Sequence, residues 1–238
     1  MKKIILLLLF LSAKSFGQQE YAVTYDYKII DKKYGNLTEV KTYLFGNGKY
    51  SLYEEDFKHE KTSESENNFS LKSMENPIFF KDLALKKTTF KDQIRMKFFN
   101  IKDSTAVFDW KITAEKKTIL GYACQKATMH FRGRNYNAYF TDKIPFQDGP
   151  WKFSGLPGMI LEIKSDDSDM SFSIVAEKVE LKKGTSKFEN PYLGKKVISY
   201  VAFVEIYNKK YQESVANNAQ DPNIPIWPKA HQEVYVEN

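Results

Sequence analysis

Alternating apolar and polar residues mark the chain from about residue 20 onward. One parity carries Tyr21, Val23, Tyr25, Tyr27 and Ile29, and the residues between them are mostly polar. This period of two is typical of an antiparallel strand with one buried face. Further strands are predicted at 40–45 and 50–54, with a turn at 46–49 between them, so the region opens as a β-meander.

A polar segment then interrupts the pattern. Residues 55–76 show almost no apolar periodicity and are predicted to form a long loop. Short strands are expected to resume after it, at 78–80, 87–91, 94–100 and 106–111.

Two longer hairpins are predicted in the middle of the chain. The first carries Ala127, Met129 and Phe131 on its outgoing arm, turns at 132–134, and returns with Tyr136, Ala138 and Phe140. The second carries Met159, Leu161 and Ile163, turns at 166–169, and returns with Met170, Phe172, Ile174 and Ala176. Three-residue turns that contain glycine commonly close hairpins, which supports the first of them.

One stretch has helical spacing, and it lies near the end of the chain. Its apolar residues recur at intervals of three and four, at Tyr200, Phe203, Val204, Tyr207, Tyr211 and Val215. The spacing predicts a helix at about 199–218 with Ser199 as its N-cap, followed by an extended proline-rich tail at about 221–238.

The elements together predict an α+β fold that is mainly antiparallel β. We expect a curved sheet or half-barrel of hairpins, covered by the single C-terminal amphipathic helix. A closed β-barrel is the alternative architecture.

The first 17 residues have the pattern of a secretory signal peptide. Lys2 and Lys3 precede an apolar run at 4–11, and Ser15 and Gly17 offer small residues to a signal peptidase. We therefore expect a mature single domain at 18–238, exported to the periplasm or the extracellular space. The apolar run is about half of the roughly 20 residues that a membrane-spanning helix needs, so no transmembrane anchor is expected. No cysteine follows the run, which argues against a lipid anchor.

The net charge and the distribution of lysines argue against one class of partner, nucleic acids. Removing residues 1–17 lowers the number of basic residues from 36 to 33, against 30 acidic residues, so the mature chain has a net charge of +3. Its lysines are scattered in pairs, which argues against a nucleic-acid partner. Aromatic residues make up 15% of the chain and supply much of the expected core.

Candidate metal and catalytic residues are sparse. The single cysteine, Cys124, and the three histidines, His59, His130 and His231, are too far apart to predict a metal site or cofactor. The acidic turn at 166–169 lacks the ligand spacing of a calcium loop. No Gly-x-Ser-x-Gly motif is present, and no catalytic residue is predicted. Cys124 is expected to be functionally inert and turned inward by a bulge between 124 and 127.

The segment 144–163 is the most distinctive part of the chain. Structural turns are predicted at Gly149, Pro150, Gly155, Pro157 and Gly158. Trp151, Phe153 and Leu156 are expected to plug one end of the sheet, and a ligand-binding lip formed by the same three side chains is the alternative. A type II turn from Leu156 to Met159, with positive φ at Gly158, is predicted to set the register of the following strand.

This segment resembles the signature of the GLPGLI family, also called the Porph_ging family. The resemblance lies in Gly155-Leu156-Pro157-Gly158-Met159-Ile160 and the upstream Gly149-Pro150-Trp151. A second element, Gly121-Tyr122-Ala123-Cys124-Gln125-Lys126-Ala127, is also similar, and Met159 replaces the leucine of the name motif. The resemblance covers the chain from about Tyr21 to the C-terminal helix and implies an exported protein of Bacteroidetes. It implies no mechanism.

Three functions are compatible with these features. The first is a non-catalytic binding or carrier module whose partner is an apolar ligand or a cell-envelope protein, held against the concave face of the sheet. The second is a structural or accessory protein of the cell envelope that acts through its surface. The third is a hydrolase without a familiar motif. No feature of the sequence selects an oligomeric state.

Overall fold

The structure is a computed structural model, and it describes residues 19–32, 35–63, 76–167, 170–229 and 233. The predicted signal peptide at 1–17 lies outside these residues, as do the centre of the polar segment and most of the tail after 229. Within the described part of the chain, no helix is long and apolar enough to cross a membrane.

The described residues form one large sheet of 13 strands. The strands in chain order are β1 (Gln19–Asp31), β2 (Asn36–Gly46), β3 (Tyr50–Glu55), β4 (Lys61–Ser63), β5 (Ile78–Asp82), β6 (Lys87–Ile94), β7 (Lys97–Ser104), β8 (Lys111–Ile119), β9 (Tyr122–Phe131), β10 (Arg134–Thr141), β11 (Met159–Asp166), β12 (Met170–Lys183) and β13 (Val197–Ser199). A short 3-10 helix, η1 (Phe57–His59), precedes β4, and the helix α1 (Tyr200–Gln220) follows β13.

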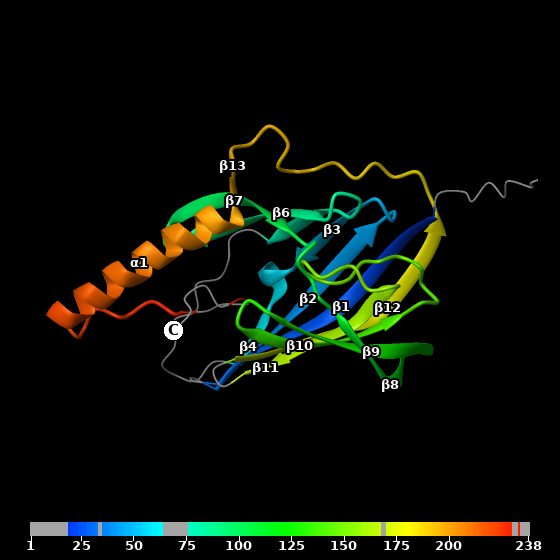
Figure 1. Cartoon of the computed structure of the whole chain (residues 1–238), viewed down its shortest axis with the longest axis horizontal. Coiled ribbons are helices and arrows are strands. Elements are labelled where there is room, and N and C mark those ends of the chain that lie inside the picture. The colour runs from blue at the N-terminus through cyan, green and yellow to red at the C-terminus, as the bar shows by residue number, and fades with distance from the viewer. Residues whose placement is uncertain (1–18, 33–34, 64–75, 168–169, 230–232, 234–238) are drawn as a thin grey trace, which may run out of the picture.

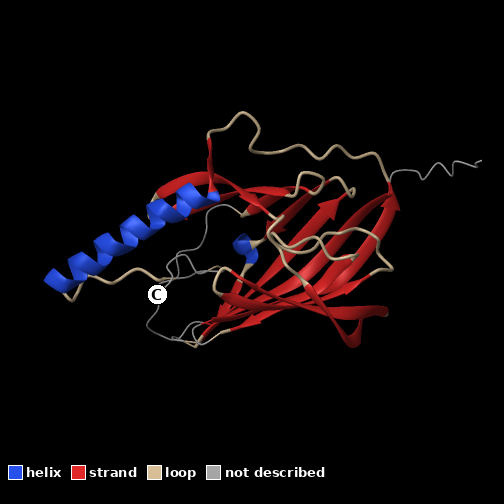
Figure 2. Cartoon of the chain, viewed as in Figure 1, coloured by secondary structure: helices blue, strands red, loops and turns tan. Residues whose placement is uncertain are grey.

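The sheet is open and curved, as Figures 1 and 2 show. Its strand order is β13-β7-β6-β5-β3-β2-β1-β12-β11-β10-β9-β8, and β4 pairs beside β2. All neighbours are antiparallel except β13 and β7. The predicted fold class is confirmed, and the alternative of a closed barrel is wrong, because β13 and β8 end the described sheet without pairing with each other.

The core lies on the inner side of this curve. Tyr21, Val23, Tyr25 and Tyr27 of β1 are each at most 1% exposed, which confirms the predicted inward parity. The intervening residues of β1 are only half-buried. The predicted meander is also confirmed, since β2 pairs with both β1 and β3.

Helix α1 begins where the spacing predicts. The side chain of Ser199 accepts a hydrogen bond from the backbone N–H of Ala202, as an N-cap should. Phe203 and Tyr207 are buried, and the ring of Phe203 packs edge-on against Phe99 of β7. The helix begins beside β7 and β13 at this end of the sheet, and its C-terminal part extends beyond the strands (Figure 1).

Two predicted strands and one predicted loop need correction. Residues 105–110 form turns and irregular structure instead of a strand, because Phe108 and Trp110 turn inward to pack against Phe153. The predicted strand 94–100 is split by a turn at Arg95 and Met96, where Arg95 has φ +55°. The predicted loop 55–76 contains η1 and the short strand β4.

The first hairpin is confirmed, but its turn is tighter than predicted. Arg134 pairs directly with Phe131, so only Arg132 and Gly133 form the turn. Their φ values of +47° and +75° match a two-residue type I′ turn, whose twist suits antiparallel strands. The second hairpin is confirmed by the pairing of Ile163 with Ile174.

Cys124 is buried, as predicted. Its side chain is 1% exposed, and burial raises the pKa of the thiol. In β9 the buried residues change from even to odd positions between Cys124 and Ala127. The pairing of β9 with β8 is irregular at the same place, between Ile112 and Lys116 of β8. The functional inertness of the thiol stays a prediction.

Candidate functional site

The segment between β10 and β11 crosses the inner side of the sheet. Phe153 packs edge-on against Tyr136 of β10, while Trp151 packs edge-on against Phe79 of β5. Because β5 and β10 lie far apart in the strand order, one segment can contact both only if the sheet curves around it. Trp151, Phe153 and Leu156 are at most 4% exposed, so all three side chains plug the half-barrel.

The Gly-Leu-Pro-Gly turn has a different geometry from the one predicted. The N–H of Gly158 donates to the carbonyl of Leu156, which closes a three-residue turn around Pro157. The N–H of Met159 donates to Ile144 instead, so the predicted type II turn is wrong. Positive φ at Gly158 is confirmed, at +149°, and a Cβ there would lie 2.0 Å from the carbonyl oxygen of Thr141. Close backbone contact, as well as φ, therefore requires this glycine.

A sealed ion pair anchors the start of this segment. Lys81 and Asp148 are both fully buried, with 2.5 Å between Nζ and Oδ1. Lys81 also donates to the carbonyl of Gly149, and the hydroxyl of Tyr21 donates to Asp148 at 2.6 Å. Burial lowers the pKa of Lys81, against the opposite effect of Asp148. Burial and Asp148 raise the pKa of Tyr21 well above its usual value, so the hydroxyl remains a donor.

A second buried network lies four residues further on. Lys152 is 1% exposed, and its Nζ donates to Glu233 at 2.5 Å and to Asp103 at 3.1 Å. Arg132 donates to both oxygens of Asp103 and, through Nη1, to Glu233, each at 2.7 Å. Two cations and two carboxylates thus balance one another; Lys152, Asp103 and Glu233 are buried, and Arg132 is 19% exposed.

Aromatic rings complete this network. Lys152 Nζ lies 4.5 Å from the ring centre of Trp151 and 4.8 Å from that of Phe90. The guanidinium of Arg132 lies 3.4 Å from the ring centre of Tyr200, at the start of α1. Although burial opposes ionisation, Lys152 and Arg132 hold the pKa of Asp103 below its usual value. Asp103 is therefore ionised at neutral pH, and aromatic faces shield the two cations.

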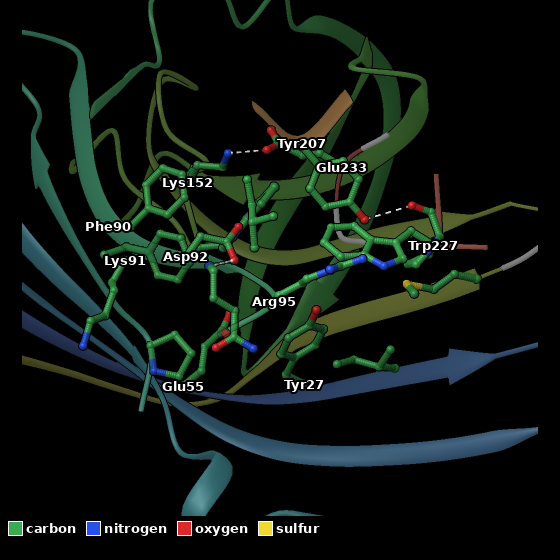
Figure 3. A pocket seen from close by; sticks show the side chains of 18 of the residues that line it. Tyr27, Glu55, Phe90, Lys91, Asp92, Arg95, Lys152, Tyr207, Trp227 and Glu233 are labelled. Atoms are coloured by element: carbon green, nitrogen blue, oxygen red, sulfur yellow. Dashed lines mark hydrogen bonds and ion pairs between the residues drawn. The ribbon is translucent and has the colours of Figure 1, made fainter. Parts of the chain in front are cut away.

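The second network opens onto a cavity of about 650 Å³. Its walls come from β1, β3, β5, β6, β12, α1, the Gly-Pro-Trp segment and the tail. The lining residues are Tyr27, Ile29, Glu55, Pro77, Phe79, Phe90, Lys91, Asp92, Gln93, Ile94, Arg95, Met96, Trp151, Lys152, Met170, Tyr207, Trp227, Pro228 and Glu233. Figure 3 shows the Lys152–Glu233 pair at one end of the cavity and Tyr27 with Glu55 at the other.

The helix and tail form one wall of the cavity. The hydroxyl of Tyr207 donates to the carbonyl of Pro228, and its ring packs against Trp227 (Figure 3). Burial and Asp92 raise the pKa of Tyr207 to about 12. The guanidinium of Arg95 lies over the ring of Trp227 at 4.8 Å. This wall is thus aromatic and carries a cation at its surface.

Trp151 has two unusual properties at this site. Its φ of +53° places a large side chain in the left-handed region, which costs about 1 to 3 kcal/mol unless its surroundings hold it there. Its buried indole N–H has no hydrogen-bond partner in the described part of the chain. Such donors are rare and call for a specific reason. Of the three predicted side chains, only Trp151 lines the cavity, while Phe153 and Leu156 lie in the core.

The histidines and the acidic turn, from which no metal site was predicted, do not converge in the described residues. His59 pairs with Asp56, His130 contacts Asn135, and His231 lies outside the described residues. In the described ranges, no three His, Cys, Asp or Glu side chains are grouped so that they could hold a metal ion. In the acidic turn, Asp167 accepts a hydrogen bond from Arg134. A second cavity, of about 540 Å³, lies beside Phe146, Ser154 and Gly155.

The sequence reasoning missed the four charged residues of the buried network. Lys152 was hidden among the turn-forming residues, and Asp103 sits on a strand with an ordinary alternating pattern. Glu233 lies in a tail predicted only from its prolines. Nothing local in the sequence distinguishes these residues from surface charges, because their partners are 29 to 101 residues away.

The chain matches the model of one known protein family. The model of a family described as "N-glycanase peptide, N-terminal domain" matches residues 62–202, more than half of the chain. The chain belongs to this family. No curated protein sequence matches it.

Several solved structures are similar to the chain. The chain is similar to PNGF-II in its P21 crystal form, with a TM-score of 0.50 and 16% identity over 81% of this chain. The C2 crystal form of PNGF-II gives 0.49 and 17% over the same share. The chain spans about a third of the length of PNGF-II, covering 34% and 33% of the two structures. A conserved protein of Thermus thermophilus is more distant, with a TM-score of 0.36 and 8% identity over 77% of this chain and 91% of that one.

Proposed function

From its membership of this N-terminal domain family, we propose that the chain is a non-catalytic binding module that holds an amphipathic ligand in the cavity beside Trp151. One observation carries the proposal. The cavity has an aromatic lining along its length and a buried ion pair at one end.

The size and lining of the cavity support this role. Ligand sites typically measure about 300 to 1,000 Å³ and combine apolar walls with a few placed polar groups. A volume of about 650 Å³ falls in that range. Tyr27, Phe79 and Phe90 offer apolar surface, while Lys152 offers a polar contact. An amphipathic ligand would match both.

We also propose that the chain is exported. The predicted signal peptide supports export, and the motif resemblance to the GLPGLI family, which stays a prediction, agrees with it. In this proposal the ligand is met in the periplasm or outside the cell, where the module either carries it or presents it to an envelope partner.

The test compares two neighbouring residues of β1. Ile29 lines the cavity, whereas Ile30 points to the other face and is 42% exposed. Ile29→Trp should fill the cavity, and Ile30→Trp should leave it open. We expect wild type and I30W to bind hexadecanol and hexadecanoate, and I29W to bind both at least about tenfold more weakly. Isothermal titration calorimetry of delipidated protein provides the measurement.

Because the family is named after an N-glycanase, an N-glycopeptide is the third ligand, and it is titrated into the same three proteins. If the glycopeptide binds and the lipids do not, the site is a glycan site and the amphipathic ligand is wrong. If I29W binds every probe as wild type does, the cavity is not the binding site.

A further inference from the structure

We infer that the cavity takes the anionic head group of its ligand, a carboxylate or a phosphate, at Lys152, and that Glu233 of the chain's own tail occupies that position in this structure. The inference rests on the proposed function and names the class of its ligand.

The geometry around Glu233 is that of a bound carboxylate. Lys152 holds one of its oxygens at 2.5 Å, and Arg132 holds the other at 2.7 Å. The residue is 1% exposed, yet it lines the cavity together with Lys152. A carboxylate gripped on both oxygens at the end of an aromatic cavity is how a protein would hold an acid.

Asp103 and Glu233 differ in how firmly they are attached. Asp103 belongs to β7, pairs with Thr88 of β6 in the sheet, and receives both prongs of the Arg132 fork. Glu233 comes from the tail beyond α1 and belongs to no helix or strand. Asp103 is therefore a fixed part of the site, while Glu233 is the carboxylate that a ligand could replace.

Charge balance favours the same exchange. Arg132 and Lys152 carry two positive charges, and Asp103 supplies one negative charge within the sheet. When Glu233 leaves, one buried cation is uncompensated, and a buried charge without a partner is strongly destabilising. An anionic head group restores neutrality, whereas a hydroxyl does not. The ring of Trp151 lies over the same cation, with its centre 4.5 Å from Lys152 Nζ.

The arrangement also orients the ligand. With its head group at Lys152, the body of an amphiphile extends past Phe90 toward Tyr27 at the other end (Figure 3). The tail carboxylate then competes with the ligand for the same cations. Removing its charge should raise the affinity for anions selectively.

The experiment uses the full mature chain and three probes of equal chain length: hexadecanoate, hexadecyl phosphate and hexadecanol. Wild type is compared with Glu233→Gln, which keeps the shape and removes the charge. Glu177→Gln is the matched control, because Glu177 pairs with Lys41 on the surface. We expect E233Q to bind one or both anions about tenfold or more tightly than wild type, with hexadecanol within about twofold. E177Q should match wild type. The anion that gains more identifies the head group.

The outcomes separate the two proposals. If all three probes bind all three proteins with unchanged affinities, the cavity binds amphiphiles but Glu233 does not compete, and this inference is wrong. If no probe binds any of them, the proposed function itself fails. If E233Q does not fold by circular dichroism, Glu233→Asp replaces it, since a shorter carboxylate loosens the grip without removing the charge. E233D should then show a smaller gain for anions alone, and no gain overturns the inference.

Discussion

Two buried lysine–carboxylate pairs flank Trp151, and they differ in what surrounds them. Lys81 and Asp148 are closed off on every side, with the second oxygen of Asp148 taken by Tyr21. Lys152 and Glu233 are as deeply buried, but they form one end of a cavity. The first pair joins strand β5 to the segment between β10 and β11, whereas the second joins that same segment to the tail.

This difference shows that burial alone does not assign a role to an ion pair. A pair whose members both sit in fixed elements can only hold the fold together. A pair with one member on a tail can exchange that member for a ligand, provided that a cavity gives access. The sealed pair should therefore govern stability, and the open pair should govern binding.

The largest effect is expected from breaking the sealed pair. Lys81→Met leaves Asp148 buried without its cation and should lower the free energy of unfolding by about 3 to 5 kcal/mol. Lys41→Met is the control, because the side chain of Lys41 is about half exposed where it pairs with Glu177. This substitution should lower the free energy of unfolding by no more than about 1 kcal/mol. Urea unfolding followed by circular dichroism measures both. Equal losses would contradict the assignment of the sealed pair to stability.

A somewhat smaller loss is expected at the turn that follows both pairs. Gly158 has a positive φ, and Gly158→Ala places a Cβ against the carbonyl of Thr141. The substitution should lower the free energy of unfolding by about 3 kcal/mol. At Gly155 the new Cβ of an alanine has no atom within 4 Å, so only the positive φ of +90° is unfavourable. Gly155→Ala should therefore lower the free energy of unfolding by about 1 kcal/mol. Thermal melts of the two variants should rank them in that order. A reversed order would show that close contact does not require Gly158.

The smallest effect concerns pH and the open network. Since the folded pKa of Asp103 lies below its usual 3.8, its contribution to stability is complete above about pH 4 and is lost as the pH falls further. The expected size is on the order of 1 kcal/mol. Asp103→Asn should flatten the fall in melting temperature between pH 5 and 3. Glu233 contacts the same two cations, Lys152 and Arg132. A variant as acid-sensitive as wild type would contradict this.

Much of the fold was predictable because its signals are local. The parity of β1, both long hairpins and the Ser199 cap follow from residues a few positions apart. The edge strand β8 was missed because its lysines and glutamate leave almost every residue exposed. Such charges protect an open edge from pairing with another chain, and they erase the apolar alternation that reveals a strand.

The candidate site was predictable only in part. Trp151 was picked out by its glycine and proline neighbours, and it does line the cavity. Asp103, Arg132 and Glu233, which form the charged network with the neighbouring Lys152, come from a strand, a turn and the tail, and only the curvature of the sheet brings them together. The Gly-Leu-Pro-Gly turn was mispredicted because Ile144, which takes the N–H of Met159, lies 15 residues away.

Contact quenching of tryptophan fluorescence shows whether an amphiphile lies in the cavity beside Trp151. Two single-tryptophan proteins are made from the three tryptophans of the chain: W110F/W227F keeps Trp151, and W151F/W227F keeps Trp110. Hexadecanoate brominated along its chain is titrated into each. Trp151 lines the cavity, whereas Trp110 packs on Phe153 and donates to Ser154. We predict strong quenching of Trp151 and little of Trp110. Quenching of Trp110 alone, or of both equally, would mean that the ligand does not lie in this cavity.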